Sequence, residues 1–372
     1  MTGMTVAVIG GGIGGTAAAC AFAQRGADVT LYEQAPAMTE VGAGLQVSAN
    51  GQKVLRALGA VGDTPPALAS VSKGTVFRDG AKGRAVAKIP SPAAGPTWYM
   101  HRADALTVLV NAAQGAGVKF VLGRMATPGT VDAELVVAAD GAHSLWRSGI
   151  DGPDSPRFTG HVAWRALVPW SGDVPTMASL TMGRKAHIVS YPLRAGSLMN
   201  IVCVEERTGW TQDSWSQTGD TSQLQHRFAD FGGNVGEILA RVSKVHTWAL
   251  HARPVAQTWF KGNTVLLGDC AHPMLPFMAQ GACMALEDAW VLADAVSASD
   301  TLERALATYV EGRRHRVSRV IGLAGGNARR FHFGKPLAWG AQLVLAAGAG
   351  MLARRLDWVY DYDATQVVSG SG

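Results

Sequence analysis

Two aspartates stand where apolar runs of the sequence end, and this placement suits ligand binding. The run "AELVVAAD" ends at Asp140 and the run "NTVLLGD" ends at Asp269. Continuous apolar runs of this kind are typical of strands covered on both faces, and hence of a parallel sheet. Because ligands of such sheets bind beyond the carboxyl ends of the strands, Asp269 could accept hydrogen bonds from a sugar-like chain of hydroxyls.

The segment after Asp269 supplies a second group that could bind a ligand. The residues "AQG", at positions 279–281, follow two prolines and open an apolar periodic segment that predicts a helix. Amides at the start of a helix can bind a phosphate or a carbonyl-bearing ring. The alternative is that Asp269 only caps a turn and that Gln280 faces solvent.

A glycine pattern near the N-terminus predicts a dinucleotide site. Gly10, Gly12 and Gly15 match G-x-G-x-x-G between a β-branched run at residues 5–9 and a helix-compatible segment at residues 14–25. Such glycines permit a tight turn, close approach of the backbone to a pyrophosphate, and close helix packing. Glu33 ends the next predicted strand, about 18 residues past Gly15, where an acid can bind ribose hydroxyls. We expect Gly10, Asp140 and Asp269 to share one crevice.

The middle of the chain predicts a second, β-rich unit. The segments "HVAWRALVPW", "ASLTM", "AHIVSYPL" and "SLMNIVCVEER" are short and separated by Gly, Pro and charged turns, which favours an antiparallel sheet. His187 and Tyr191 lie four residues apart, so on a regular strand both side chains point to the same face. Taken alone, they could be two half-buried polar residues with satisfied hydrogen bonds.

Composition limits the class of protein. The 372 residues, 48% of them hydrophobic, can bury a large core and predict two domains. The net charge of +5 comes from scattered Lys and Arg, which disfavours a nucleic-acid partner. The four cysteines form no CxxC pair. This argues against a disulfide framework or a metal site and suits reduced thiols in the cytoplasm.

Residues 336–352 form the most apolar late segment of the chain. Its length is near the lower limit for a membrane span, but it contains Gln342 and several glycines and is followed by Arg354 and Arg355. We therefore favour a helix packed on the protein over a membrane-surface helix, and we expect no stable membrane association. Because the first predicted strand begins near Thr5, we also expect no targeting peptide.

Three ordered segments together resemble the fingerprints of single-component FAD-dependent aromatic monooxygenases. They are the Gly10, Gly12 and Gly15 pattern with Glu33, the segment "ADGAHSLWR", and the segment "GDCAHPMLPFMAQGACMALEDA". The resemblance covers residues 6–364 and is nearest to the salicylate hydroxylase, 3-hydroxybenzoate 6-hydroxylase and 6-hydroxynicotinate 3-monooxygenase branch. This sequence has "AQG" where many relatives have "GQG". The three fingerprints are specific for FAD and much less specific for substrate.

The resemblance implies roles in binding the cofactor. Glu33 would bind the adenosine ribose, Arg102 in "YMHRADAL" would reach the pyrophosphate, and Asp269 would hold the ribityl chain. Gln280 and Gly281 would lie near the isoalloxazine ring. A further segment would serve both FAD and the nicotinamide cofactor, NADH or NADPH, which binds transiently. Its residues are Asp140, Gly141, Ser144 and Arg147.

The resemblance also implies roles in binding the substrate. Relatives in this branch place a His and a Tyr beside the aromatic substrate at positions that match His187 and Tyr191, which we therefore predict to be the catalytic residues. A histidine near its unperturbed pKa could take the phenolic proton, which activates the ring for electrophilic oxygen transfer. Pro273 and Pro276 would shape the wall where oxygen meets the flavin. Gln46 would donate to a substrate oxygen or only stabilise its loop.

Three other polar or aromatic residues receive a structural interpretation. Trp164 and Arg165 form a pair that relatives often share, and we interpret both as mainly structural. His272 closely follows Asp269 and could be mistaken for a catalytic base, but in this motif we expect it to support the loop.

The predicted fold is α/β (α+β overall), with a Rossmann-like FAD-binding domain, a smaller antiparallel β-sheet substrate domain and C-terminal helices. The FAD-binding domain would comprise residues 1–71, 99–157 and 257–330, the substrate domain residues 72–98 and 158–256, and the helical segment residues 331–372. The predicted enzyme uses NAD(P)H and O2 to hydroxylate a small phenolic or hydroxypyridine carboxylate through a flavin hydroperoxide. It would be a monomer or homodimer.

Three other functions share these fingerprints. A flavin epoxidase or hydroxylase would act on a more apolar substrate, an oxidase-like flavoprotein would yield no oxygenated product, and a non-catalytic flavin-binding protein would show no substrate-stimulated NAD(P)H consumption.

Overall fold

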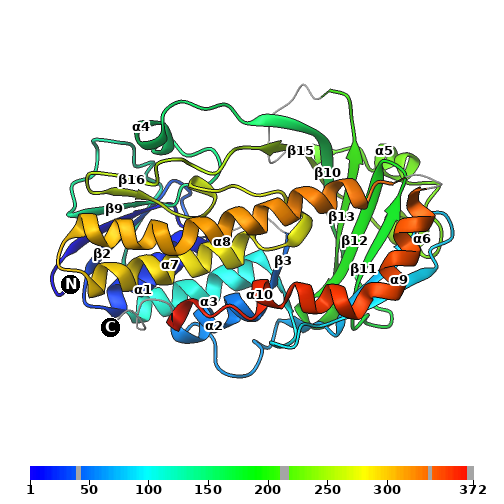
Figure 1. The fold of residues 1–372 in the computed structure, drawn as a ribbon, viewed down its shortest axis with the longest axis horizontal. Coiled ribbons are helices and arrows are strands. Elements are labelled where there is room, and N and C mark those ends of the chain that lie inside the picture. The colour runs from blue at the N-terminus through cyan, green and yellow to red at the C-terminus, as the bar shows by residue number, and fades with distance from the viewer. Residues whose placement is uncertain (39–42, 210–217, 334–336, 367–372) are drawn as a thin grey trace.

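The computed structural model describes residues 1–38, 43–209, 218–333 and 337–366. These residues form three β-sheets, and Figure 1 shows the two larger sheets at opposite ends of the molecule. The long helix α8, Leu302–Arg330, runs from one end toward the other. The predicted α/β fold is confirmed.

The first sheet is the parallel sheet that the apolar runs predict. Its strand order is β16-β17-β9-β1-β2-β8, and only the edge strand β16 is antiparallel to its neighbour. The strands are β1 Thr5–Ile9, β2 Asp28–Glu33, β8 Lys119–Leu122, β9 Leu135–Ala138, β16 Phe260–Lys261 and β17 Thr264–Leu266. All four residues of β9 are buried. This explains its unbroken apolar sequence.

Helices cover the first sheet and form most of the core. Helix α1, Ile13–Gln24, packs against α3, Arg102–Gly115, and α7, Gly281–Ala298. Close approach is possible because α1 presents small side chains, of which Ala17 and Ala18 are fully buried. A three-stranded sheet joins this core beside helix α2, Ala49–Ala57. Its strands are β3 Gly44–Val47, β7 Trp98–His101 and β4 Ser70–Val71.

The second large sheet has eight strands in the order β14-β15-β10-β13-β12-β11-β5-β6. The strands are β5 Gly74–Asp79, β6 Ala85–Pro90, β10 Arg157–Pro169, β11 Ala178–Gly183, β12 Ala186–Leu193, β13 Leu198–Glu206, β14 Thr218–Gly219 and β15 Val245–Ala252. Neighbouring strands are antiparallel, as predicted, except that β5 and β11 are parallel. The β5–β6 hairpin comes from an earlier part of the chain, so a tight turn does not fix its direction relative to β11.

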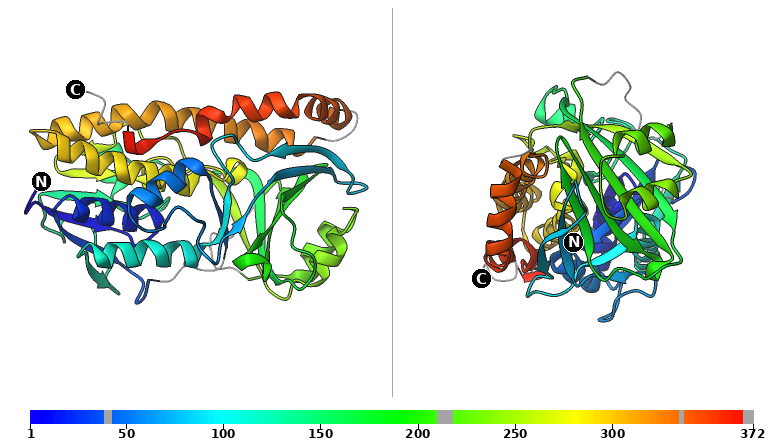
Figure 2. Two further views of the ribbon diagram at one scale, coloured as in Figure 1. Left: turned by 90° about the horizontal axis from the view of Figure 1, so that it is seen from below. Right: turned by 90° about the vertical axis from the view of Figure 1, so that its right-hand side faces the viewer.

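The two faces of this sheet serve different purposes. On one face, Trp164, Ile188 and Cys203 form a core with helices α5, Thr221–Arg227, and α6, Val235–Ala240. The other face turns toward the first sheet and remains open to a cavity. The left view of Figure 2 shows α5 and α6 at the outer side of this sheet, away from the first sheet.

The C-terminal helices lie along one side of the molecule (Figure 2). Helix α9, Leu337–Arg355, packs on β6, and α10, Asp357–Tyr360, packs on α2 and α9. The predicted packed helix at residues 336–352 is thus present, although Pro336 lies outside the described residues. Among the described residues, no helix is long and apolar enough to cross a membrane.

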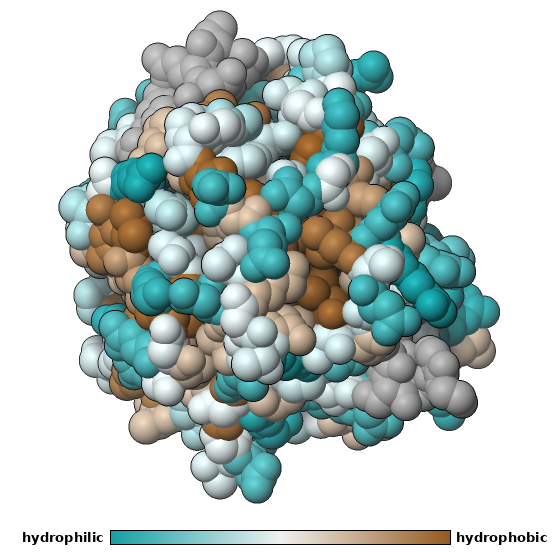
Figure 3. Space-filling view, turned by 90° about the vertical axis from the view of Figure 1, so that its left-hand side faces the viewer, coloured by the Kyte–Doolittle hydropathy of each residue, from teal (hydrophilic) through white to brown (hydrophobic). Residues whose placement is uncertain are grey.

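The end of the molecule that the first sheet forms has a mixed surface. Figure 3 shows apolar side chains there in separate patches, divided by hydrophilic ones. Such a mixture is ordinary for a face in contact with water.

Candidate active site

A cavity of about 1540 Å³ lies between the two large sheets. Pockets for drug-sized ligands measure about 300–1,000 Å³, so this one can hold a dinucleotide together with a small second ligand. Its wall contains the predicted binding residues except Gly15, Ser144 and Arg147. Those in the wall are Gly10, Gly12, Glu33, Gln46, Arg102, Asp140, Gly141, His187, Tyr191, Asp269, Pro273, Pro276, Gln280 and Gly281.

The glycine loop is closely packed against its neighbours. Gly10 has φ +102°, and a Cβ atom there would lie 2.5 Å from the carbonyl oxygen of Ala139. A Cβ atom at Gly15 would overlap the carbonyl oxygen of Gly10. Gly12 is the N-cap of α1. The loop therefore needs glycine, and it brings the unpaired first-turn amides of α1 to the cavity.

Glu33 lies beside this loop at the end of β2. Its Oε2 accepts a hydrogen bond of 2.6 Å from the backbone N–H of Gly11, and its Oε1 accepts one of 2.8 Å from Ala35. These bonds fix the carboxylate at the cavity wall. Arg102 is the first residue of α3 and also lines the cavity.

Asp140 and Asp269 follow adjacent strands, β9 and β17, as predicted. Asp140 accepts hydrogen bonds from the Leu145 backbone N–H at 2.9 Å and from the Cys270 thiol at 3.4 Å. The Asp269 side chain is accessible inside the cavity yet surrounded by protein. Burial therefore raises its pKa, which the positive charges of His272 and Arg102 oppose. Both aspartates present acceptors to one crevice.

Gln280 connects the start of α7 to α2. It is only 2% exposed, accepts a hydrogen bond of 3.0 Å from Asn50 Nδ2, and donates one of 2.9 Å to Ser48 Oγ. It does not face solvent, which removes the alternative raised from the sequence. Gly281 begins α7, so the amides of that first turn lie at the cavity wall.

The loop with Pro273 and Pro276 is anchored from below. His272 Nε2 lies 2.5 Å from Asp288 Oδ2, and Asp288 Oδ1 accepts a hydrogen bond of 2.7 Å from Arg313. His272 is 1% exposed. It therefore supports the loop, as expected from the sequence.

Arg147 anchors the same loop from another side. Its side chain is fully buried and donates to the carbonyl oxygens of Pro254 at 2.7 Å and Cys270 at 3.3 Å. Ser144 Oγ accepts from the Arg147 backbone N–H at 3.1 Å. Neither residue is in the cavity wall; both hold the "DGAHSLWR" segment in place, and Asp140 and Gly141 are the predicted residues of this segment that reach the cavity.

His187, Val189 and Tyr191 project from one face of β12 into the cavity wall, as the strand period predicts. His187 is 2% exposed and packs against the rings of Phe277 and Phe331. Burial lowers its pKa well below the usual value, with help from His332 and His161. The pKa is thus not near its unperturbed value, contrary to what the sequence had suggested, because the fold buries the ring; the imidazole is neutral near pH 7 and has a nitrogen that can accept a proton from a ligand.

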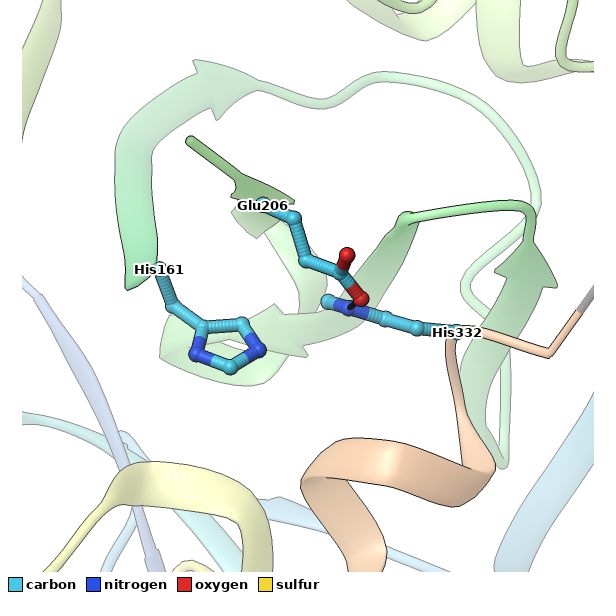
Figure 4. A group of neighbouring side chains, drawn as sticks. All are labelled: His161, Glu206 and His332. Atoms are coloured by element: carbon cyan, nitrogen blue, oxygen red, sulfur yellow. Dashed lines mark hydrogen bonds and ion pairs between the residues drawn. The ribbon is translucent and has the colours of Figure 1, made fainter. Parts of the chain in front are cut away.

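His187 is also hydrogen-bonded to residues that the sequence did not indicate. Its Nδ1 lies 2.7 Å from His332 Nε2, and His332 Nδ1 lies 3.0 Å from Glu206 Oε1. Figure 4 shows Glu206 and His332 pointing toward each other, with the ring of His161 to one side. Glu206 ends β13 and His332 follows α8, so only the fold brings them together.

The Tyr191 side chain is buried and closely packed, which does not favour a role in proton exchange. Its ring lies 4.7 Å from that of Tyr99, and a Cβ atom at Gly44 would lie 2.7 Å from its hydroxyl oxygen. Burial raises its pKa, although Arg165 opposes this shift. Tyr191 is therefore a neutral phenol near pH 7 that shapes the wall.

Arg165 belongs to the cavity wall, which differs from the structural interpretation made from the sequence. Its guanidinium lies 4.4 Å from the ring centre of Trp248. Trp164 does point into the core on the other face of the sheet, where it donates to Glu205 at 2.9 Å. Because side chains alternate along a strand, neighbours in "AWRAL" can differ in role.

The cavity fits FAD. A diphosphate needs N–H donors, which the first-turn amides of α1 and the glycine loop provide. Ribose and ribityl hydroxyls need acceptors, which Glu33, Asp140 and Asp269 provide. Gly10, Gly11, Gly12 and Gly14 line the cavity without side chains, so a pyrophosphate can approach the backbone closely there.

Comparison with known proteins agrees with this fit. Residues 121–324 match the family model described as an FAD binding domain, and residues 8–39 match an NAD(P)-binding Rossmann-like domain. The chain is 32% identical to 3-amino-4-hydroxybenzoate 2-monooxygenase of Streptomyces platensis, over 98% of this chain and 97% of that protein. It is also 32% identical to 3-hydroxybenzoate 6-hydroxylase of Polaromonas naphthalenivorans, over 88% of each. A salicylate hydroxylase substrate complex superposes with TM-score 0.82 at 25% identity, covering 99% of this chain and 98% of that one.

Proposed function

Since the chain belongs to the FAD-dependent aromatic monooxygenases, the family that its three fingerprints resemble, we propose that it hydroxylates a small phenolic or hydroxypyridine carboxylate. It is an FAD-dependent oxidoreductase that uses NAD(P)H. One observation supports this substrate class. The guanidinium of Arg165 and the neutral imidazole of His187 lie on one wall of a cavity that is otherwise largely apolar.

The strand register supports this choice of ligand. Arg165 pairs with Val202 on β13, and Val202 pairs with Val189 on β12. Two strand spacings separate Arg165 from β12, roughly 10 Å between backbones. Long side chains can close that gap around one aromatic ring, with its carboxylate at Arg165 and its phenol oxygen at His187.

Different residues of the chain would bind the cofactor and orient the substrate. Glu33, Arg102, Asp140 and Asp269 would hold FAD, with the amides that begin α1 and α7. Bound FAD would supply the redox chemistry, taking electrons from NAD(P)H and activating O2. Arg165 would orient the substrate by its carboxylate.

His187 would take the phenolic proton, because a phenolate ring is a better nucleophile toward an electrophilic oxygen. Phe277 and Phe331 flank this imidazole and would limit the access of water. Gln46, Pro273 and Pro276 would complete the wall around the substrate. Tyr191 would support the ring from the sheet.

The domain division follows the same proposal. Residues 1–71, 99–157 and 257–330 would bind the cofactor, and residues 72–98 and 158–256 would cover the substrate. The C-terminal segment would close one side of the cavity, which Leu345, Leu356 and Tyr360 line. Parts of these ranges lie outside the described residues.

The test is a substrate panel. Purified enzyme loaded with FAD is incubated with NADH or NADPH and with salicylate, hydroxybenzoates, amino-hydroxybenzoates or hydroxynicotinates, while products are followed by mass. The proposal expects one class to stimulate NAD(P)H oxidation and to gain one oxygen atom. Stimulation without an oxygenated product would indicate an oxidase-like flavoprotein, and stimulation only by apolar compounds without a carboxylate would indicate the epoxidase-like alternative.

A further inference from the structure

A chain of hydrogen bonds leads from the cavity wall to the protein surface. His187 Nδ1 is 2.7 Å from His332 Nε2. His332 Nδ1 is 3.0 Å from Glu206 Oε1 (Figure 4). The side chain of His332 is 2% exposed, whereas that of Glu206 is 38% exposed. The three groups thus connect a buried imidazole to a carboxylate in contact with water.

The carboxylate fixes the proton positions along this chain. An ionised carboxylate only accepts hydrogen bonds, so His332 must carry its proton on Nδ1. In a neutral imidazole the other nitrogen then accepts, so His332 Nε2 must receive a hydrogen bond from His187 Nδ1. This leaves His187 Nε2 without a proton. It is the nitrogen that remains to face a ligand in the cavity.

We propose that His332 and Glu206 form a proton relay that sets His187 as the base and carries the substrate proton to solvent. This inference rests on the proposed phenol hydroxylation. The phenol O–H bond breaks and its proton passes to His187 Nε2 as His187 Nδ1 gives its proton to His332 Nε2. His332 Nδ1 then gives its proton to Glu206, which releases it to water. The products are a bound phenolate, one solvent proton and both imidazoles in the Nε2–H form; the reverse transfers, with a proton taken from water through Glu206, protonate the product phenolate and restore both Nδ1–H forms.

The surroundings suit transfer better than storage of the proton. Burial lowers the pKa of His332 to about 4, an effect that the Glu206 hydrogen bond opposes. The charged or titratable neighbours are His161, whose ring centre is 5.2 Å from that of His332, and Arg227, which disfavours a second positive charge. The imidazolium forms are therefore sparsely populated near pH 7.

The fold holds the relay in place. The carbonyl oxygen of His332 accepts a hydrogen bond of 3.2 Å from the Lys185 backbone N–H in the turn before β12. One nitrogen or oxygen from each of His161, Glu206 and His332 lies within 4.8 Å of the others, a spacing that a metal ion can also use. However, both ring nitrogens of His332 already lie within hydrogen-bonding distance of Glu206 and His187. This favours a relay.

The first test determines which ring nitrogens carry protons, and it does not require the enzyme to be active. The FAD-loaded protein is labelled with ¹⁵N-histidine, and long-range ¹H–¹⁵N spectra identify the protonated nitrogen of each ring. The relay predicts the Nδ1–H form for both His187 and His332, and loss of this preference at His332 in Glu206→Gln. An Nε2–H form at His187 in the wild-type protein would overturn the proposal.

The second test reads proton transfer itself. Oxidised, FAD-loaded enzyme is mixed with the active phenol, and phenolate absorbance and proton release to an indicator dye are followed. Glu206→Gln and His332→Gln should form phenolate roughly 10- to 100-fold more slowly, and their rates should rise with buffer concentration while the wild-type rate does not. The matched control is Glu237→Gln, which changes an exposed glutamate on α6.

The results distinguish failure of the relay proposal from failure of the proposed function. Wild-type phenolate formation that is unchanged in both variants, with FAD still bound, would overturn the relay while the hydroxylase assignment stands. If the wild-type enzyme hydroxylates no phenol, the proposed function fails. In that case the histidine spectra still decide whether the His187, His332 and Glu206 chain is polarised toward the cavity.

Discussion

His187 combines a position in the cavity wall with a neutral, buried imidazole. We predict that His187→Ala retains bound FAD but loses turnover by about 10²- to 10⁴-fold, the usual contribution of a general base. The measurement is kcat with the active substrate, alongside the flavin absorbance of the purified variant. A variant that turns over at the wild-type rate would remove His187 from the reaction.

Arg165 is the residue proposed to bind the substrate carboxylate, and its substitution tests this role. Arg165→Met should raise KM for a carboxylate substrate by roughly 10- to 100-fold, because a charge-assisted hydrogen bond contributes about 1.5–3 kcal/mol. The guanidinium also stacks on Trp248. Arg165→Lys is therefore the control that keeps the charge, and it should show the smaller change. For the amide analogue of the substrate, KM should be nearly the same in wild type and Arg165→Met. An equal rise in KM for the acid and the amide would contradict carboxylate binding.

At the level of elements, the packing of α1 against the glycine loop is the most restrictive feature. Gly15→Ala would force its Cβ atom into the Gly10 carbonyl oxygen. We predict a loss of about 1–3 kcal/mol in the free energy of unfolding and weaker FAD binding, measured by denaturant titration and by flavin fluorescence.

The matched control for this change is Gly115→Ala at the end of α3, where a Cβ atom meets nothing within 4 Å. It should leave both quantities close to wild type. If Gly15→Ala behaves like this control, the close approach of α1 does not determine cofactor binding.

The elements also show why part of the fold could be predicted. The strands at Thr5–Ile9 and Asp28–Glu33 have local signals, since apolar β-branched runs end at glycine or acid. The parallel pairing of β5 with β11 has no such signal, because it joins segments about 100 residues apart. For the same reason, His332 and Glu206 could not be linked to His187 from spacing. Arg165 was missed because strand alternation alone does not say which face meets the cavity.

At the scale of the whole molecule, buried charges join the cofactor loop to the long helices. Asp288 on α7 contacts His272 and Arg313, and Glu287 contacts Arg316 at 2.8 Å. Arg316 also donates to the Val359 carbonyl oxygen at 2.7 Å, which fastens the C-terminal segment. This network explains how a C-terminal segment distant in sequence is fixed against α7 and α8.

The same network predicts acid sensitivity. Burial would raise the pKa of Asp288, but His272 and Arg313 outweigh it and lower the pKa from 3.8 to about 2. A folded-state pKa below the unfolded value stabilises the fold above pH 4, and this contribution is lost as pH falls toward 2. The free energy of unfolding should drop in that window by on the order of 2 kcal/mol from this group.

The corresponding variant is Asp288→Asn, measured by thermal denaturation across pH. It should be about 3 kcal/mol less stable than wild type at neutral pH, because it leaves buried Arg313 with one carboxylate fewer. It should also lose less stability between pH 4 and 2. Parallel pH profiles for the two proteins would show that Asp288 is not the group responsible.

The most direct test of the account is oxygen transfer to an aromatic acid by the intact, FAD-loaded enzyme. NAD(P)H oxidation is measured under ¹⁸O2 with each phenolic or hydroxypyridine carboxylate of the panel, and the mass of the product is determined by mass spectrometry. The account predicts that at least one such acid accelerates NAD(P)H oxidation and leaves with one ¹⁸O atom on its ring. Basal oxidation that no aromatic acid changes, with no labelled product, would contradict it.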